Sequence, residues 1–235
     1  NKITKAVTAS LMAAAMLTTT VATIAPMSVS AGQVLGENDF TYKALPWHTC
    51  ETNPAKQTFE LTSDGTFHVT VKEPGGVAAG GESRWDLQFR HRNLTFKAGH
   101  TYKIHWEVKV SRPGIQINTK IGNIKGDEEY WNNNNAGPHG GGTWNPIITI
   151  NSTEWQKFDS TWTCPQNLEG VEWAFHYGGA GANQPTPCTQ SGDEIWFDNM
   201  SIEDTTGSEG DWKGGQDNLS ALGVMNRDNS GLENN

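Results

Sequence analysis

The segment Tyr102-Lys103-Ile104-His105-Trp106-Glu107-Val108-Lys109-Val110 alternates apolar and polar side chains at every position. Successive side chains of a β-strand point to opposite faces, so a period of two indicates a strand with one face in a core and the other in water. A helix would instead need apolar residues three and four positions apart. The segment therefore predicts a β-protein built of half-buried strands.

The same alternation recurs along the chain, and turn residues such as those at 63–65 separate the repeats. It is clear in residues 84–90, 114–121 and 171–177, and further strands are expected at 57–62, 66–72, 155–163 and 194–202. About ten short antiparallel strands over about 170 residues predict an all-β fold, a two-sheet antiparallel β-sandwich of jelly-roll type.

Composition excludes several classes of protein. Of 235 residues, 18 % are charged, and the chain carries 26 Gly and 10 Trp, which is unlike a coiled coil or a charge-rich disordered chain. The net charge is −9 and the sequence has no basic cluster, so nucleic acid is not an expected partner. No feature indicates oligomerisation, and we expect a monomer.

The two ends of the chain differ from the middle. Residues 1–31 have the features of a secretory signal peptide: a positively charged start at Lys2 and Lys5, an apolar stretch, and a small-residue cleavage site ending at Ala31. No other segment is apolar enough to span a bilayer, so a secreted, extracellular protein without a membrane partner is expected. Residues 32–205 form the predicted domain, and the Gly- and acid-rich residues 206–235 are expected to be a linker or the start of a following region.

Three cysteines, Cys50, Cys164 and Cys188, lie far apart in the sequence and fit no metal-ligand spacing. In an oxidising compartment they predict one disulfide and one free thiol, and the spacing leaves the pairing open.

Large indoles occur in polar surroundings. Trp131 lies between acidic residues and a run of asparagines, and Trp144 follows a glycine-rich loop. Flat rings cover the apolar face of a sugar, while amides and charged groups bond its hydroxyls, so exposed indoles here indicate a sugar site. The alternative is that these tryptophans cap the end of the sandwich.

Several motifs, taken together and in order, resemble those of family 4 carbohydrate-binding modules, in particular those at the N-terminus of cellulosomal family 9 cellulases. The motifs are residues 45–51, 85–92, 99–102, 120–122, 129–134 and 175–179. This resemblance implies a jelly roll whose concave sheet forms an open cleft for a single β-1,4-glucan chain. It implies a non-catalytic module that binds amorphous cellulose, cello-oligosaccharides or mixed-linkage β-glucan, with xyloglucan as a further candidate, and that targets an appended cellulase to plant cell wall polysaccharide.

Matching the motifs residue by residue implies the site. The stacking indoles would be Trp131, Trp85 and Trp144, and the polar cleft residues would be Gln88, Arg90, Arg92, Asn118, Glu172 and His176. The alternation independently places all of these polar residues except Arg92 on the polar faces of their strands. Trp85 has the parity of the core residues and needs a bulge or a strand end to reach a cleft, so we rank Trp131 above Trp85.

The resemblance also implies a structural calcium ion remote from the cleft, held by Asp39, Asp198 and the carbonyl of Gly65, since oxygen ligands suit calcium. The cysteines depart from the family pattern, since Cys50 matches it and Cys164 and Cys188 do not. If the last strand runs antiparallel to the first, the loop that holds Cys188 lies near Cys50, so we expect a Cys50–Cys188 disulfide. Residues 136–143 are an insertion relative to the family and are expected to reshape the cleft rim.

Two other functions remain open. A small jelly-roll glycoside hydrolase would use Glu107 and Glu172 as a carboxylate pair across the scissile bond. A protein-interaction module would use Trp131 and Trp144 as an aromatic hot spot.

Overall fold

The computed structural model describes residues 32–33, 35, 40, 47–125, 128–132 and 147–206. The predicted signal peptide, the predicted linker after Thr206, Asp39, Trp144 and the insertion at 136–143 lie outside these residues, so the predictions on them stay predictions. Within the described ranges no helix is long and apolar enough to cross a membrane.

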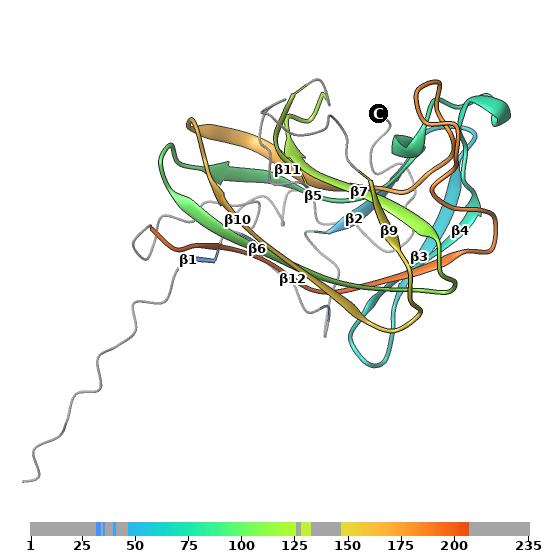
Figure 1. The fold of residues 1–235 in the computed structure, drawn as a ribbon, viewed down its shortest axis with the longest axis horizontal. Coiled ribbons are helices and arrows are strands. Elements are labelled where there is room, and N and C mark those ends of the chain that lie inside the picture. The colour runs from blue at the N-terminus through green and yellow to red at the C-terminus, as the bar shows by residue number, and fades with distance from the viewer. Residues whose placement is uncertain are drawn as a thin grey trace, which may run out of the picture. The chain divides into compact units, whose positions relative to one another are not determined.

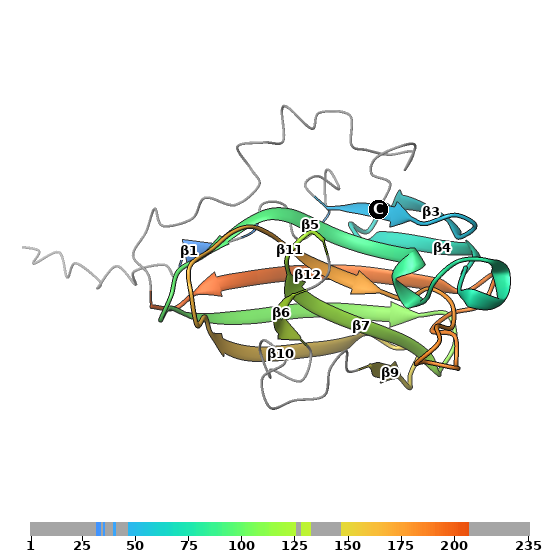
Figure 2. The same cartoon turned by 90° about the horizontal axis from the view of Figure 1, so that it is seen from above.

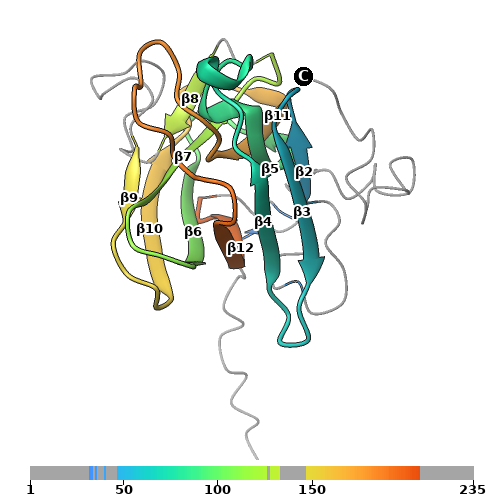
Figure 3. The same cartoon turned by 90° about the vertical axis from the view of Figure 1, so that its right-hand side faces the viewer.

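Two antiparallel sheets form the described part of the chain, which confirms the predicted β-sandwich (Figures 1 and 2). The β6 sheet has the order β10 (Gln156–Thr163), β6 (Thr101–Val110), β12 (Glu194–Asp204), β4 (Phe67–Glu73) and β3 (Lys56–Leu61), with β1 (Gly32–Gln33) added to β12. The β11 sheet has the order β2 (His48–Glu51), β5 (Leu87–Phe96), β11 (Leu168–His176), β7 (Ile115–Gly122) and β8 (Glu129–Asn132), with β9 (Ile148–Ile150) added to β7. In Figure 3 the β3–β4 hairpin lies on one side of β12, and β6 and β10 lie on the other.

The start of β5 departs from the prediction. The alternation extends back to residue 84, but Arg84–Asp86 forms a 3-10 turn, η2, and the strand begins at Leu87. The Asp86 carboxylate causes this, because its Oδ2 accepts hydrogen bonds from the backbone N–H groups of Gly76 at 2.7 Å and Glu82 at 2.8 Å. A buried carboxylate that gathers backbone donors fixes a turn before the strand. A second 3-10 turn, η1 (Val77–Ala79), lies just upstream.

Aromatic rings from both sheets meet at Phe89 in the core. Its ring centroid lies 4.6 Å from that of Trp47 and 4.5 Å from those of Phe67 and Phe197. Phe67 and Phe197 belong to the β6 sheet, whereas Phe89 belongs to the β11 sheet, so these contacts join the two layers. Ring pairs at such distances add to the large apolar area that each ring buries.

The core also holds a titratable side chain, that of His91. It is fully buried beside Trp47, with ring centroids 5.4 Å apart, and its Nδ1 donates a hydrogen bond to the Arg92 carbonyl at 2.9 Å. Burial is the main reason that the pKa of His91 falls to about 3, and the nearby His48 lowers it further. The ring is therefore neutral in the folded protein at neutral pH.

This lowered pKa predicts acid sensitivity. Between its unfolded pKa of about 6.5 and its folded pKa of about 3, His91 binds a proton in the unfolded chain but not in the folded one. Stability from His91 is thus fully present above the higher value and is lost as pH falls, by up to about 1.4 kcal/mol per pH unit. Urea unfolding at several pH values should show a shallower loss for His91→Leu than for the wild type. Equal slopes for the two proteins would contradict this assignment.

Candidate functional site

Polar side chains line up across the outward face of the β11 sheet. Gln88 in β5 pairs with His176 in β11, which pairs with Asn118 in β7. In the next row Arg90 pairs with Ala174, which pairs with Lys120. Directly paired residues of antiparallel strands lie on the same face. The structure thus brings together on one face of this sheet the residues that their alternation predicts: Gln88, Arg90, Asn118, Lys120, Glu172 and His176. Arg92, which only the resemblance assigned to the site, joins them, with His48 at the β2 edge and Asn132 at the β8 edge. These residues form the polar face.

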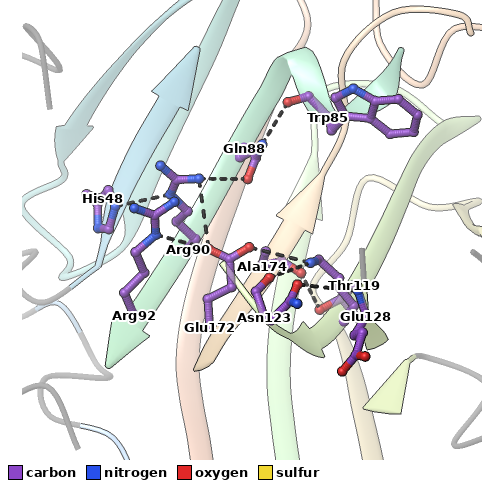
Figure 4. A network of polar contacts seen from close by, with 11 residues as sticks. His48, Trp85, Gln88, Arg90, Arg92, Thr119, Asn123, Glu128, Glu172 and Ala174 are labelled. Atoms are coloured by element: carbon purple, nitrogen blue, oxygen red, sulfur yellow. Dashed lines mark hydrogen bonds and ion pairs between the residues drawn. The ribbon is translucent and has the colours of Figure 1, made fainter. Parts of the chain in front are cut away.

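The carboxylate of Glu172 holds three cations on this polar face. Its oxygens lie 3.0 Å from Arg92 Nε, 3.9 Å from Arg90 Nη1 and 3.5 Å from Lys120 Nζ. Figure 4 shows the two arginines reaching toward Glu172 from the same strand. Only 3 % of the Glu172 side chain is exposed, and attraction between charges strengthens away from water. The network therefore depends on every member, because a buried charge left unpaired is expensive.

Arg90 is also fixed from its other side. Its Nε donates to His48 Nε2 at 3.2 Å, and its Nη1 donates to Gln88 Oε1 at 3.2 Å. Since a guanidinium only donates, His48 accepts through Nε2 and is neutral, with its proton on Nδ1. Gln88 in turn donates from Nε2 to the Trp85 carbonyl at 2.9 Å, which connects the network to η2 (Figure 4).

The prediction that the polar face is wet is wrong for this sheet. Arg90 is 1 % exposed and Glu172 2 %, while the Arg92 side chain, at 15 %, reaches solvent more. The charged groups lie along the sheet against one another instead of extending into water. His176 is also buried, and its pKa lies well below the usual value, first because of burial and then because Lys120, Arg84 and Arg90 are near.

The prediction that Trp131 stands exposed in a loop is wrong. Trp131 lies in β8 and pairs with Ile121, which in turn pairs with Trp173. All three side chains are therefore on the core face, where Trp131 is 1 % exposed and its ring centroid is 6.5 Å from that of Trp173. An indole on the core face offers no ring to a sugar, so the ranking of Trp131 above Trp85 is reversed.

Trp85 lies just before a strand, which is one of the two positions from which a residue of its parity can reach a cleft. It is in η2, before β5 begins, and its ring is partly exposed. Its Nε1 donates to Glu82 Oε2 at 2.7 Å, and the Arg84 guanidinium carbon lies 5.3 Å from the ring centroid. Figure 4 shows the ring beyond Gln88, at one end of the polar face. Among the described tryptophans that the resemblance assigns to the site, Trp85 is the one with an accessible ring.

Glu107 and Glu172, the carboxylates that a glycoside hydrolase would use, do not lie together. Glu107 lies on the outward face of the β6 sheet, whereas Glu172 lies on the outward face of the β11 sheet, so the core separates them. Glu107 bonds to Lys157 Nζ at 2.8 Å and to His105 Nε2 at 3.2 Å. Burial raises the pKa of Glu107, but these hydrogen bonds outweigh it and leave that pKa below its ordinary value. Glu107 therefore belongs to a separate surface ion pair.

The predicted Cys50–Cys188 disulfide is wrong, because all three cysteines are buried free thiols. Cys50 lies in β2 opposite Gln88, while Cys188 Sγ lies 3.1 Å from Gln184 Nε2. Burial raises the pKa of Cys188 to about 11, and that of Cys164 likewise, so both are neutral thiols at neutral pH.

Of the three predicted calcium ligands, Gly65 and Asp198 lie within the described residues, and Asp39 lies outside them. Gly65 lies in the turn before β4, with φ of 85°, and Asp198 lies in β12. Phe67 pairs with Phe197, so both residues are at the same end of the β4–β12 pair. The described residues contain no group of three or more His, Cys, Asp or Glu side chains that could hold a metal ion. The ion therefore stays a prediction.

Three functional candidates were missed by the sequence reasoning. Lys120 had the right parity, and its alternation with Asn118 could have selected it. His48 lies in a four-residue strand, too short for alternation to show. Arg84 lies in a turn whose geometry depends on Asp86, so no periodicity could have found it.

The chain is similar to known carbohydrate-binding proteins. A family model described as "Carbohydrate binding domain" matches residues 32–187, more than half of the chain. A cellulose 1,4-beta-cellobiosidase of Acetivibrio thermocellus is 30 % identical over 160 residues, which cover 61 % of this chain and 16 % of that protein's length. A solved structure described as "CBM4 structure and function" matches with a TM-score of 0.51 and 18 % identity, over 72 % of this chain and 96 % of that one. The N-terminal cellulose-binding domain of Cellulomonas fimi β-1,4-glucanase C gives a TM-score of 0.47 and 14 % identity, over 73 % of this chain and 97 % of that one.

The positions of the two tryptophans predict losses of stability of different size on substitution. Trp131→Ala removes a core indole and should lower the free energy of unfolding by about 3–5 kcal/mol. Trp85→Ala removes a partly exposed ring and should lower it by less than about 1 kcal/mol. Chemical unfolding followed by circular dichroism measures both. A stable Trp131→Ala protein would restore the exposed-loop interpretation.

Proposed function

This chain belongs to the carbohydrate-binding domain family, whose members are non-catalytic, and from that premise we propose that its polar face binds single β-1,4-glucan chains in an open cleft. The observation that carries the proposal is the ordered row of amide and charged groups on the β11 sheet, with a partly exposed indole at one end. Hydroxyl groups of a sugar chain both donate and accept, and Gln88, Arg90 and Glu172 offer partners for both.

The fixed positions of these side chains support a role in binding sugar. Glu172, Arg90 and Gln88 already have their positions fixed by one another, so a ligand would not have to order them. Fixed side chains lose little conformational entropy on binding. Trp85 and Arg92 reach solvent most, so we propose that the sugar chain contacts them first.

The proposed role of the whole protein is to bring a catalytic module to plant cell wall polysaccharide outside the cell. The similarity to a stretch of a much longer cellobiosidase supports an appended catalytic module. A cleft that exchanges hydrogen bonds with water at a net gain of only about 1 kcal/mol each should bind weakly. We expect dissociation constants from roughly micromolar to sub-millimolar, which neighbouring modules would strengthen by avidity.

The glucan proposal predicts retention without hydrolysis. In affinity electrophoresis, the protein should be retarded by hydroxyethylcellulose or mixed-linkage β-glucan, and a reducing-sugar assay should detect no product. Trp85→Ala should weaken retention by about tenfold or more, because the stacking ring is lost. Trp155→Ala is the matched control, a partly exposed indole next to β10 on the other sheet, and should not change retention. The proposal fails if no glucan retards the protein or if Trp85→Ala binds as the wild type does.

We also propose that Asp198, the Gly65 carbonyl and Asp39 hold a structural calcium ion. Phe40, which follows Asp39, packs on Phe67 with ring centroids 5.5 Å apart, and Phe67 pairs with Phe197 beside Asp198. The sequence neighbours of all three oxygen donors thus meet at Phe67, and oxygen ligands suit calcium.

Calcium should therefore raise stability. A ligand that binds only the folded state adds about 2.7 kcal/mol at a hundred times its dissociation constant, so EGTA should lower the melting temperature. Asp198→Asn should abolish the difference between calcium and EGTA, while retention by glucan persists because the polar face lies on the other sheet. An unchanged melting temperature in EGTA would contradict the calcium site.

A further inference from the structure

Arg84 has an unusual environment for an arginine. It is 5 % exposed, and its Nη1 donates to Gln184 Oε1 at 3.0 Å. Its Nε and Nη2 are buried and have no hydrogen-bond partner. Leaving buried donors unsatisfied is unfavourable, most of all on a charged group. Nε and Nη2 form one edge of the guanidinium, and that edge can pair with both oxygens of a carboxylate.

No carboxylate among the described residues lies within ion-pair distance of Arg84. On the polar face, Glu172 is already shared by Arg90, Arg92 and Lys120. Burial lowers the pKa of Arg84, and the opposing effects of Cys188 and Glu129 are smaller than that of burial.

The carboxylates nearest to Arg84 in the sequence are used elsewhere. Asp86 Oδ2 accepts hydrogen bonds from the backbone N–H groups of Gly76 and Glu82, and Glu82 Oε2 accepts one from Trp85 Nε1. The positive charge of Arg84 is therefore left without an ion-pair partner among the described residues.

His176 gives an independent indication of positive charge at this end of the polar face. Its ring is buried, and its Nδ1 has no hydrogen-bond partner. After burial, the groups that most oppose its protonation are Lys120, Arg84 and Arg90, so all three cations lie near it. The site thus combines unpaired positive charge with an unused polar nitrogen.

The accessible ring of Trp85 lies directly beside this charge. The Arg84 guanidinium carbon is 5.3 Å from the centroid of that ring. The guanidinium lies over the indole, so a sugar unit that reaches Trp85 also comes near Arg84 and its unpartnered N–H groups. A neutral hydroxyl could use one of the two free N–H groups, but a carboxylate would use both and would neutralise the charge.

We propose that Arg84 is a binding residue for the carboxylate of an acidic sugar unit, and that the domain prefers β-glycans carrying uronic acids to neutral ones. This inference rests on the proposed sugar-binding role of the polar face and extends it to a substrate class. Because the protein is itself acidic, such a preference cannot come from its overall charge and must come from a local site.

The test compares two ligands that differ only in the groups at their C6 positions. Cellohexaose and the same hexasaccharide with its C6 positions oxidised to carboxylates are titrated into the full chain by calorimetry at low salt and neutral pH. The oxidised form should bind at least about fivefold more tightly, as a bidentate charged pair implies. The ratio should shrink in about 0.5 M NaCl, because salt screens the attraction between the protein and a charged ligand as it approaches.

Variants then assign the preference to Arg84. Arg84→Gln should bring the ratio of the two affinities to about one, and Arg84→Lys, which keeps the charge but loses the bidentate edge, should lose most of it. Lys103→Gln removes the same charge from an exposed position on β6 and should keep the wild-type ratio. Melting temperatures check that each variant is folded, and Arg84→Gln should melt no lower than the wild type because its buried donors were unsatisfied.

The outcomes separate this inference from the function on which it rests. If cellohexaose binds and the oxidised form binds no better, or if Arg84→Gln keeps the preference, the inference is overturned while the proposed function stands. If neither hexasaccharide binds, the proposed function fails and the preference falls with it.

Discussion

The ion network around Glu172 is the constraint on which the β11 sheet and its site both depend. β11 is the central strand of this sheet and pairs with β5 on one side and β7 on the other. Arg90 and Arg92 reach Glu172 from β5, and Lys120 reaches it from β7. A slip of one residue in either pairing would turn these charges into the aromatic core. The same contacts that fix the register therefore build the proposed binding surface.

The two faces of the β11 sheet have different roles: the core face stabilises the fold, and the polar face is the proposed binding surface. On the core face, Phe89 joins the layers through rings of the β6 sheet, and Trp131 and Trp173 continue the packing. On the polar face, the side chains satisfy one another instead of water. Side chains whose hydrogen bonds and ion pairs are already formed within the protein are rigid. A rigid surface presents hydrogen-bonding groups at fixed spacing along the strands.

Much of this arrangement follows from alternation alone. The long strands β5, β6, β7 and β11 show a clear period of two, which was enough to place Gln88, Arg90 and Glu172 on one face. Alternation failed where elements are short or where a turn intervenes. Trp131 lies in a strand of only four residues. Trp85 lies in the turn that Asp86 stabilises, so it is not part of the alternating strand. Residue spacing could not predict that the charges of the polar face pair with one another and are buried. It also could not predict that the cysteines are free thiols. Both features depend on distances between strands.

The central claim is that the polar face of the β11 sheet is where sugar binds. Titrating cellohexaose into the ¹⁵N-labelled full chain, with nuclear magnetic resonance detection, tests it residue by residue. If sugar binds there, the amide signals of Gln88, Arg90 and Glu172 and the side-chain Nε signals of Arg90 and Arg92 should shift in proportion to bound ligand. Signals of Lys103 and Asp159, on the outward face of the β6 sheet, should stay in place. Shifts confined to the β6 sheet, with the polar face unperturbed, would contradict the account.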